Sequence, residues 1–163
     1  MYKIKLLILL LPSLLISCTT THIQDNNLEF KLGYVGGEFN GLILSNLLES
    51  NLSSLGLKNE KSNYEIRASI DHSSSVYITN IDNTSDREKI VSQLTVKVLN
   101  KKDECVAYQY KESISQFYIY ASSEKFISNQ QATEEIKFNN TEGLVREFVN
   151  QLAYAEISCD KYE

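Results

Sequence analysis

The sequence predicts an α+β fold: a two-layer sandwich in which a four-stranded, mostly antiparallel sheet is covered on one face by two helices. Three observations support this prediction. Apolar residues recur at every second position in some segments and at every third or fourth position in others, and these two patterns alternate along the chain. Three alternating segments follow one another directly, and two amphipathic stripes are available to cover them. The predicted order is strand, helix, three strands, helix, within a single domain over residues 28–163.

The first strand and the first helix are predicted within residues 28–56. The stretch "LEFKLGYVGG", 28–37, alternates apolar and polar residues and stops at two glycines, which is typical of a short strand. From residue 38, apolar residues recur at intervals of three and four, which indicates an amphipathic helix with Gly56 as its C-cap. The glycines of "YVGGEFNG" lack the GxGxxG spacing of a phosphate-binding loop, so a turn at the strand end explains them better.

The middle of the chain predicts an antiparallel meander of three strands. The first begins at residue 63, is interrupted by the polar patch "HSSS", and resumes at Val76. After the turn "NIDNTSD", a second strand places Ile90 and the apolar residues that alternate after it on one face. A five-residue hairpin loop, "NKKDE" at 100–104, leads to a third strand that runs from Val106 to about residue 120. We expect one face of this meander to be exposed to water.

A closing helix is predicted from residue 122 onward. Ser122 or Ser123 can cap it, with Glu124 in the first turn. A loose apolar stripe is followed by a stronger one over 144–155, and "FNNTEG" separates the two. Either one long helix bends near Asn140, or two helices meet there. The pattern favours one helix with a weak middle.

The N-terminus has the composition of a secretory signal. Lys3 and Lys5 precede a mostly apolar stretch over residues 6–16. Such a stretch would form about 16 Å of helix, roughly half the thickness of a bilayer core, so it is too short to span a membrane.

The end of this leader indicates lipid attachment. Leu15-Ile16-Ser17-Cys18 resembles the lipobox of bacterial lipoproteins. That resemblance implies a diacylglycerol on the thiol of Cys18, cleavage between Ser17 and Cys18, and acylation of the new amine. Several acyl chains on one residue should hold a protein firmly on a membrane. The alternative is an ordinary secretory signal that happens to contain a cysteine.

The predicted lipidation site divides the chain into a signal peptide at 1–17, a lipidated cysteine with a polar tether at 18–27, and the folded domain. In many lipoproteins an Asp after the cysteine retains the protein at the inner membrane. Here Thr19 follows, so the resemblance favours the outer membrane, on its periplasmic side.

The composition of the mature chain argues against several classes of function. Removing residues 1–17 leaves 146 residues with 14 basic and 21 acidic side chains, a net charge of about −7. This charge disfavours nucleic-acid binding, which needs a basic surface. No cluster of basic residues stands out along the sequence.

No arrangement of residues suggests an enzyme, a metal site or a cofactor site. The chain has two histidines, His22 in the tether and His72 in a strand, and it lacks HExxH, CxxC and nucleophile-elbow motifs. Asp71, His72 and Ser73 are consecutive on an extended segment, so their side chains alternate between faces and do not form a triad as neighbours. An envelope hydrolase is therefore the weakest functional hypothesis.

Two cysteines remain after the leader, Cys105 at the start of a predicted strand and Cys159 near the C-terminus. In an oxidising periplasm an even pair is a candidate disulfide, which would tie the tail to the sheet. Two unpaired thiols are the alternative.

Two surface features each have two interpretations. The aromatic cluster "QFYIY", 116–120, could grip an acyl chain or line the contact with a barrel wall, but such residues also pack beneath helices. Lys101 and Lys102 at the hairpin tip could meet phosphates of an anionic glycolipid, although a solvated loop explains them as well.

The order of elements beneath a lipobox resembles the LPS-assembly lipoprotein family, LptE. The local similarity extends from "REKIVSQLTVKVLN" through "KKDE" and "CVAYQYKESISQFYIY" to "ASSEKFISNQQATEEI" and "GLVREFVNQLA". The resemblance implies an outer-membrane plug in the lumen of the LptD β-barrel, which helps that barrel assemble and assists delivery of lipopolysaccharide to the outer leaflet. The alternative is a stand-alone periplasmic ligand-binding or envelope-structural lipoprotein without a barrel partner.

Overall fold

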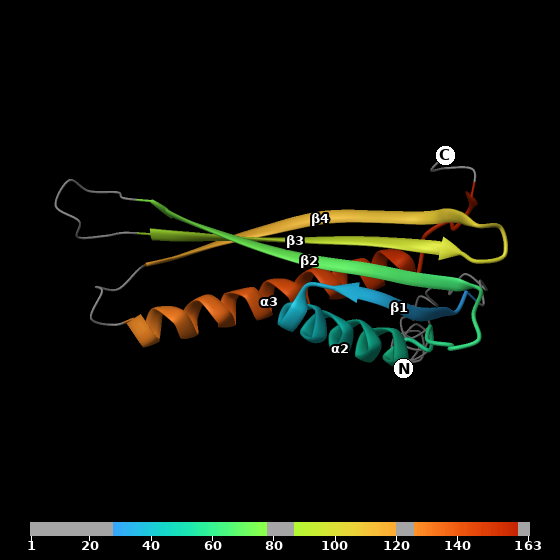
Figure 1. Ribbon diagram of the computed structural model, residues 1–163, viewed down its shortest axis with the longest axis horizontal. Coiled ribbons are helices and arrows are strands. Elements are labelled where there is room, and N and C mark those ends of the chain that lie inside the picture. The colour runs from blue at the N-terminus through green and yellow to red at the C-terminus, as the bar shows by residue number, and fades with distance from the viewer. Residues whose placement is uncertain (1–27, 78–86, 120–125, 160–163) are drawn as a thin grey trace, which may run out of the picture.

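The fold is known from a computed structural model, which describes residues 28–77, 87–119 and 126–159. In chain order the elements are β1 (Phe30–Gly36), α2 (Glu38–Ser54), β2 (Tyr64–Tyr77), β3 (Arg87–Asn100), β4 (Cys105–Ile119) and α3 (Phe126–Leu152) (Figure 1). This order confirms the predicted α+β sandwich. The leader, Cys18, the tether, the turn "NIDNTSD" and the capping serines Ser122 and Ser123 lie outside the described residues.

The four strands form one sheet in the order β1-β2-β3-β4. β1 and β2 are parallel neighbours, and helix α2 connects them in the chain. β2, β3 and β4 form an antiparallel meander. The sheet is therefore mostly antiparallel, as predicted. Figure 1 shows that β2, β3 and β4 continue well beyond β1 and α2, and that α3 runs beneath them for most of their length.

The core lies between the sheet and the two helices. Alternate residues of β2 and β3 are buried, including Ile66, Ile70, Leu94 and Val98. The helices cover them with residues spaced at three and four: Leu44, Leu48 and Leu52 from α2, and Leu144, Val145, Phe148, Val149 and Leu152 from α3. Because the period is two in the strands and 3.6 in the helices, each element presents one apolar face to this layer.

At the C-terminus of α2 the C-cap is Leu55, and Gly56, predicted as the cap, is the left-handed residue that follows it. This residue has φ 68°, a conformation that an L side chain disfavours. The amide of Gly56 donates to the carbonyl of Ser53 at 3.1 Å, and that of Leu57 donates to the carbonyl of Leu52 at 2.9 Å. These two bonds define a Schellman motif, which satisfies the last carbonyls of the helix.

The closing helix is continuous over Phe126–Leu152, as the sequence favoured. Two of the polar residues in its middle, Asn140 and Thr141, are buried, whereas Asn139 and Glu142 are exposed. Asn140 is fully buried, and its Nδ2 donates to Oγ of Ser92 at 3.0 Å. The hydroxyl of Thr141 donates to the carbonyl of Lys137 at 2.8 Å, within the helix. Asn140, within "FNNTEG", therefore gives α3 a polar contact with the sheet.

The β3–β4 hairpin differs from its prediction in two details. Asn100 pairs with Cys105, so the loop has four residues, 101–104, rather than five. The side-chain oxygen of Asn100 accepts bonds from the amides of Lys102 and Asp103, at 3.0 and 3.3 Å, which closes the turn. A β-bulge opposite Val98 and Leu99 then leaves Ala107 as an extra, buried residue.

Candidate functional site

The face of the sheet that points away from the helices, here called the outer face, is basic. On the described strands its charged residues are two acidic ones, Glu65 and Asp71, and six basic ones: Lys31, Arg67, Arg87, Lys89, Lys97 and Lys111. The whole chain has a net charge of −5. The fold therefore separates charge, because the strand register brings together cations that are far apart in sequence. This basic surface corrects the expectation from the sequence, along which no cluster of basic residues stands out.

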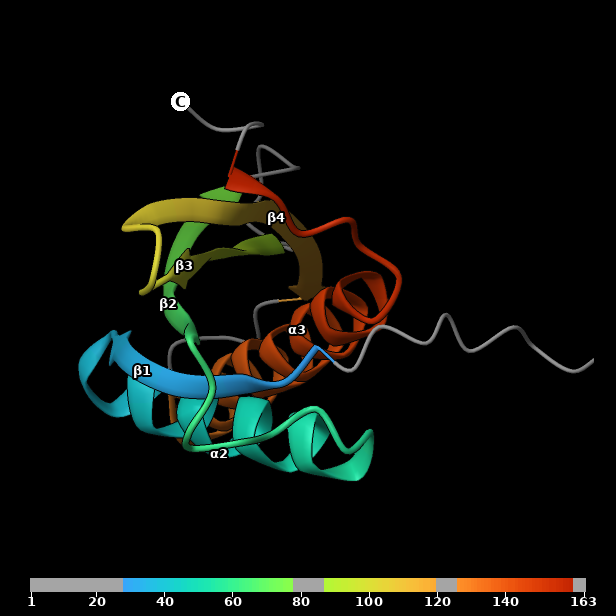
Figure 2. The ribbon, with the colours of Figure 1, turned by 90° about the vertical axis from the view of Figure 1, so that its right-hand side faces the viewer.

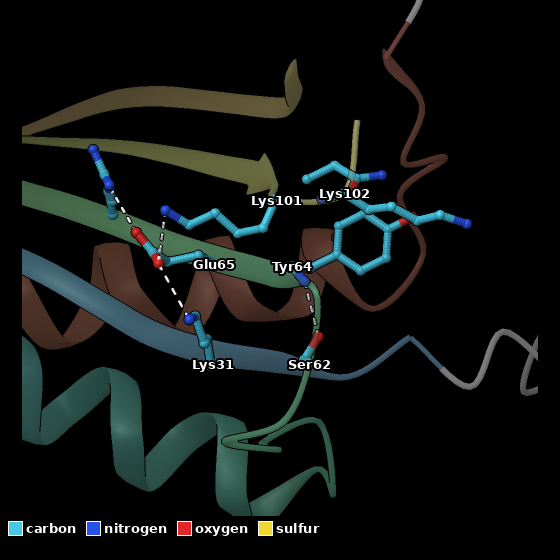
Figure 3. A network of polar contacts seen from close by, with 8 residues as sticks. Lys31, Ser62, Tyr64, Glu65, Lys101 and Lys102 are labelled. Carbon is cyan, nitrogen blue, oxygen red and sulfur yellow. Dashed lines mark hydrogen bonds and ion pairs between the residues drawn. The ribbon is translucent and has the colours of Figure 1, made fainter. Parts of the chain in front are cut away.

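Glu65 is the centre of an ion cluster on this face. Its carboxylate accepts Nε of Arg67 at 2.7 Å, and lies 3.1 Å from Nζ of Lys101 and 3.4 Å from Nζ of Lys31. In Figure 3, Lys31 from β1 and Lys101 from the hairpin approach this carboxylate from different sides. Three cations with one carboxylate leave the cluster with a net charge of +2. Lys101, for which the sequence left open a phosphate contact or a solvated loop, thus pairs with Glu65 beside the basic surface.

The position of Glu65 is set by its neighbours. Its side chain is only 11% exposed. The bond from Arg67, followed by those from Lys101 and Lys31, lowers the pKa of this carboxyl to about 2, although desolvation opposes the shift. Gly33 of β1 provides the space: a Cβ there would lie 2.6 Å from Cγ of Glu65. The carboxylate therefore stays ionised and fixed at all physiological pH values.

A small cavity of about 210 Å³ adjoins this cluster. Tyr34, Arg67 and Lys97 line it, together with three small residues, Ala68, Ser69 and Thr95. The cations and the hydroxyls offer hydrogen-bond donors without a carboxylate among the lining residues. Such a set fits an anionic group, for example a phosphate, better than a cation.

A polar layer lies beneath the far half of the sheet, facing α3. Nδ1 of His72 and Oγ of Ser92 are 2.8 Å apart, and Ser92 also accepts the bond from Asn140. Burial, and then the charge of Lys137, lower the pKa of His72, against smaller opposite effects of Glu134 and Asp71. Asp71 lies on the other face of the sheet and is exposed. The "DHSSS" segment therefore does not bring its Asp, His and Ser side chains together.

The aromatic cluster "QFYIY" divides between the two faces. Tyr118 lies on the helix side, where its hydroxyl bonds to Glu88 of β3 and lies 3.0 Å from Oγ1 of Thr133 of α3. Phe117 and Ile119 are on the outer face and exposed, with Nζ of Lys89 5.6 Å from the centre of the Phe117 ring. Packing beneath a helix thus explains Tyr118 but not Phe117. Tyr120 lies outside the described residues.

Cys105 and Cys159 form a disulfide, with their Cα atoms 5.7 Å apart. The bond ties the segment that follows α3 to the start of β4 (Figure 2). Between this segment and α3 lies an open groove of about 770 Å³, here called the C-terminal groove. Its larger lining residues are Tyr108, Arg146, Glu147, Asn150, Gln151 and Tyr154. This groove could not be predicted from the sequence, because its lining residues share a surface only once the segment after α3 has folded back.

The other predicted site residues fall outside the structural description. Cys18 and the peptidase-recognition residues Leu15, Ile16 and Ser17 lie before residue 28, so lipid attachment stays a prediction. Within residues 28–77, 87–119 and 126–159, no group of His, Cys, Asp or Glu is arranged to hold a metal ion. Over the same ranges, no helix combines the length and apolar character needed to cross a membrane.

The fold is shared with bacterial lipoproteins of known structure. The chain is similar to a minor lipoprotein from Acinetobacter baumannii, with a TM-score of 0.59 and 11% identity over 80% of this chain and 93% of that one. Rare lipoprotein B from Shewanella oneidensis gives a TM-score of 0.61 at 12% identity, covering 78% and 93%. Lipoprotein B from Nitrosomonas europaea gives 0.54 at 12%, covering 77% and 82%.

At these identities the likeness shows a common fold. No model of a known protein family matches the chain, and no curated protein matches it in sequence.

Proposed function

We propose that this chain is an outer-membrane lipoprotein, acylated at Cys18, that plugs an LptD-type β-barrel and assists delivery of lipopolysaccharide to the outer leaflet. One combined observation carries the proposal: a lipobox-like Leu15-Ile16-Ser17-Cys18 precedes a sandwich whose fold recurs in several lipoproteins, rare lipoprotein B among them. The resemblance of residues 86–155 to LptE supports the barrel partner.

The charge of the outer face suits both proposed partners. The lumen of an outer-membrane barrel is polar, so a plug needs a hydrophilic surface around its own core. Lipopolysaccharide carries phosphate groups. The outer face presents Arg67, Lys97 and Lys111, and its basic residues outnumber its acidic ones. Clustered cations attract phosphates more strongly than isolated ones, and the attraction weakens with salt.

Purification from detergent-solubilised envelopes tests the barrel partner. A plug should co-purify with a much larger membrane protein and resist separation from it. Recovery as a free monomer would overturn the plug proposal and favour the stand-alone lipoprotein. Mass spectrometry of the N-terminal peptide tests the anchor in the same sample. We expect a peptide that begins at Cys18 and carries acyl chains, and an intact leader would contradict it.

Charge reversal tests the glycolipid contact. Lys97→Glu places a carboxylate beside Arg67 in the outer-face cavity, and we expect it to weaken binding to lipopolysaccharide several-fold at low salt. Lys61→Glu is the matched control, because Lys61 is an exposed lysine in the loop before β2. Equal losses in both variants would mean that only net charge matters.

A further inference from the structure

The border of the sheet formed by β4 is open over residues 109–115, here called the β4 edge. β4 is the last strand in the sheet order, and it forms one long border of the sheet in Figure 1. Residues 111–115 are all exposed. This holds even for Glu112 and Ile114, which share the helix side of the sheet with the buried Tyr110. Helix α3 therefore does not extend over this edge.

The sheet register shows which backbone groups of the β4 edge point outward. The amide of Lys101 donates to the carbonyl of Asn63 at 2.9 Å, so the backbone at Lys101 faces β2. Backbone groups of successive residues in a strand point to opposite sides, so Asn100 and every second residue before it face β4, and their partners in β4 face β3. The residues between those partners have amides and carbonyls that point outward and lack a partner among the described residues: Gln109, Lys111, Ser113 and Ser115.

The opposite border of the sheet is also open in part, but its side chains differ. β1 forms that border as far as Ser69 of β2, and beyond this point β2 itself is the border. Over residues 71–75 of β2, the outer-face side chains are those of Asp71, Ser73 and Ser75, with no cation among them. Charge therefore distinguishes the β4 edge from this second edge.

The side chains around the β4 edge favour an acidic strand. Over residues 87–100 and 105–119, the outer face carries no carboxylate and four cations: Arg87, Lys89, Lys97 and Lys111. A strand added at β4 would place every second side chain beside Lys111, and opposite charges on neighbouring strands stabilise their pairing. Its other side chains would lie beside Glu112 and Ile114, the latter 37% exposed. A segment that alternates acidic and apolar residues fits both faces.

A second copy of this chain is a poorer occupant of the β4 edge. Two copies paired through this edge about a twofold axis would form one continuous sheet. Their outer faces would then lie side by side, each with the same cations, and like charges on adjacent strands destabilise their pairing. Charge therefore favours a different polypeptide.

We propose that the β4 edge binds an extended segment of another protein as a fifth strand, with acidic residues at alternate positions on the outer face. An exposed strand edge is a ready template for such pairing. The main-chain bonds to residues 109–115 supply the affinity, and the cations of the outer face select an acidic segment. The proposal does not depend on a barrel partner or on lipopolysaccharide.

Binding of synthetic peptides to the purified full-length protein tests the proposal. The probe is a fluorescent peptide of about eight residues that alternates Glu and Val, and a peptide with Lys in place of Glu is its control. We expect the acidic peptide to bind, its affinity to fall as salt rises, and the basic peptide to bind at least about tenfold more weakly. The absence of binding by the acidic peptide up to about 1 mM overturns the proposal, whatever the barrel experiment shows.

Backbone methylation tests whether the peptide binds as a strand. Two further acidic peptides carry N-methyl groups, one on its Glu amides and the other on its Val amides. An added strand bonds to its neighbour through alternate residues, so exactly one of the two should lose binding. Equal affinities of the two methylated peptides would contradict strand addition.

Proline at outward-facing positions locates the binding. Ser113→Pro removes an outward amide but no bond to β3, so it should weaken binding of the acidic peptide at least about tenfold. Ser113→Ala keeps the amide and should bind as the wild type does. Ser74→Pro is the matched control, because Ser74 faces outward on the opposite border. A loss in Ser74→Pro and not in Ser113→Pro would contradict the assigned edge.

A charge variant and the oligomeric state complete the test. Lys111→Glu leaves the backbone unchanged, and we expect it to weaken binding of the acidic peptide and to strengthen that of the basic one. Lys61→Glu, in the loop before β2, should leave both affinities unchanged. Sedimentation of the wild type should show no dimer that depends on the β4 edge. A dimer that Ser113→Pro converts to a monomer would show that a second copy occupies this edge, and would overturn the proposal.

Discussion

At the residue scale, the carboxylate of Glu65 determines how closely cations can be assembled on the outer face. Arg67, Lys31 and Lys101 come from two strands and a hairpin, and each contacts this one side chain. Without the carboxylate, the three positive charges would repel one another across a partly buried space. Glu65 thus links β1, β2 and the β3–β4 hairpin and holds the basic surface together.

Replacing this carboxylate should cost measurable stability. We expect Glu65→Gln to lower the free energy of unfolding by about 1–2 kcal/mol at pH 7. This is below the value of about 3–5 kcal/mol for a fully buried pair, because the cations are one-third to one-half exposed. Since folding lowers this pKa from 4.5 to about 2, the stabilisation is fully present above pH 4.5 and is lost as the pH falls towards 2. Urea titrations of both proteins at several pH values should therefore converge in acid.

His72 predicts a second pH dependence, in a milder range. Its pKa is below 6.5 in the folded protein, so the unfolded chain takes up the proton more readily. The stability that neutral His72 provides is therefore present above pH 6.5 and declines as the pH falls below it. His72→Gln keeps a hydrogen-bonding group near Ser92 but does not titrate. A stability profile between pH 7.5 and 5 that is equally steep in both proteins would show that another group is responsible.

At the scale of single elements, two glycines have opposite expected effects. Gly56 has φ 68° in the Schellman motif, so Gly56→Ala should destabilise the protein by about 1 kcal/mol. Gly143 lies within α3, and a Cβ there would meet no atom within 4 Å. Gly143→Ala should therefore stabilise the protein by about 0.5–1 kcal/mol. Thermal unfolding of the pair tests this, and shifts of the same sign would contradict it.

The elements themselves could be predicted because their periodic patterns are long. The alternation of β3 and the apolar stripe of α2 set the type of each element, and Gly56 set one boundary. The errors in the elements concern the β3–β4 hairpin. Asn100 was assigned to the hairpin loop, but it pairs with Cys105 in the sheet. The β-bulge at Ala107 was not predicted, because the alternation of apolar and polar residues does not indicate it. At Asn140 the sequence correctly favoured a continuous helix but left a break open as the alternative, because its partner, Ser92, is 48 residues away in sequence.

At the scale of the whole molecule, the candidate sites depend on contacts between distant segments. The cations of the outer face alternate with inward-facing residues along four strands, so only the register shows that they form one surface. The C-terminal groove needs the tail to return to β4. Sequence patterns record the period of each element, but they do not record which side chains of different elements become neighbours. The fold was therefore predictable, and the composition of its surfaces was not.

The disulfide is the covalent link that fixes this largest-scale arrangement. It joins residues 54 positions apart, and in the chain-entropy model a loop of that length stabilises the folded state by up to about 4 kcal/mol. We expect Cys105→Ser with Cys159→Ser to lower the free energy of unfolding by most of that amount, and reduction of the wild-type protein should produce the same loss. Unchanged stability after verified reduction would show that noncovalent contacts alone hold the tail against β4.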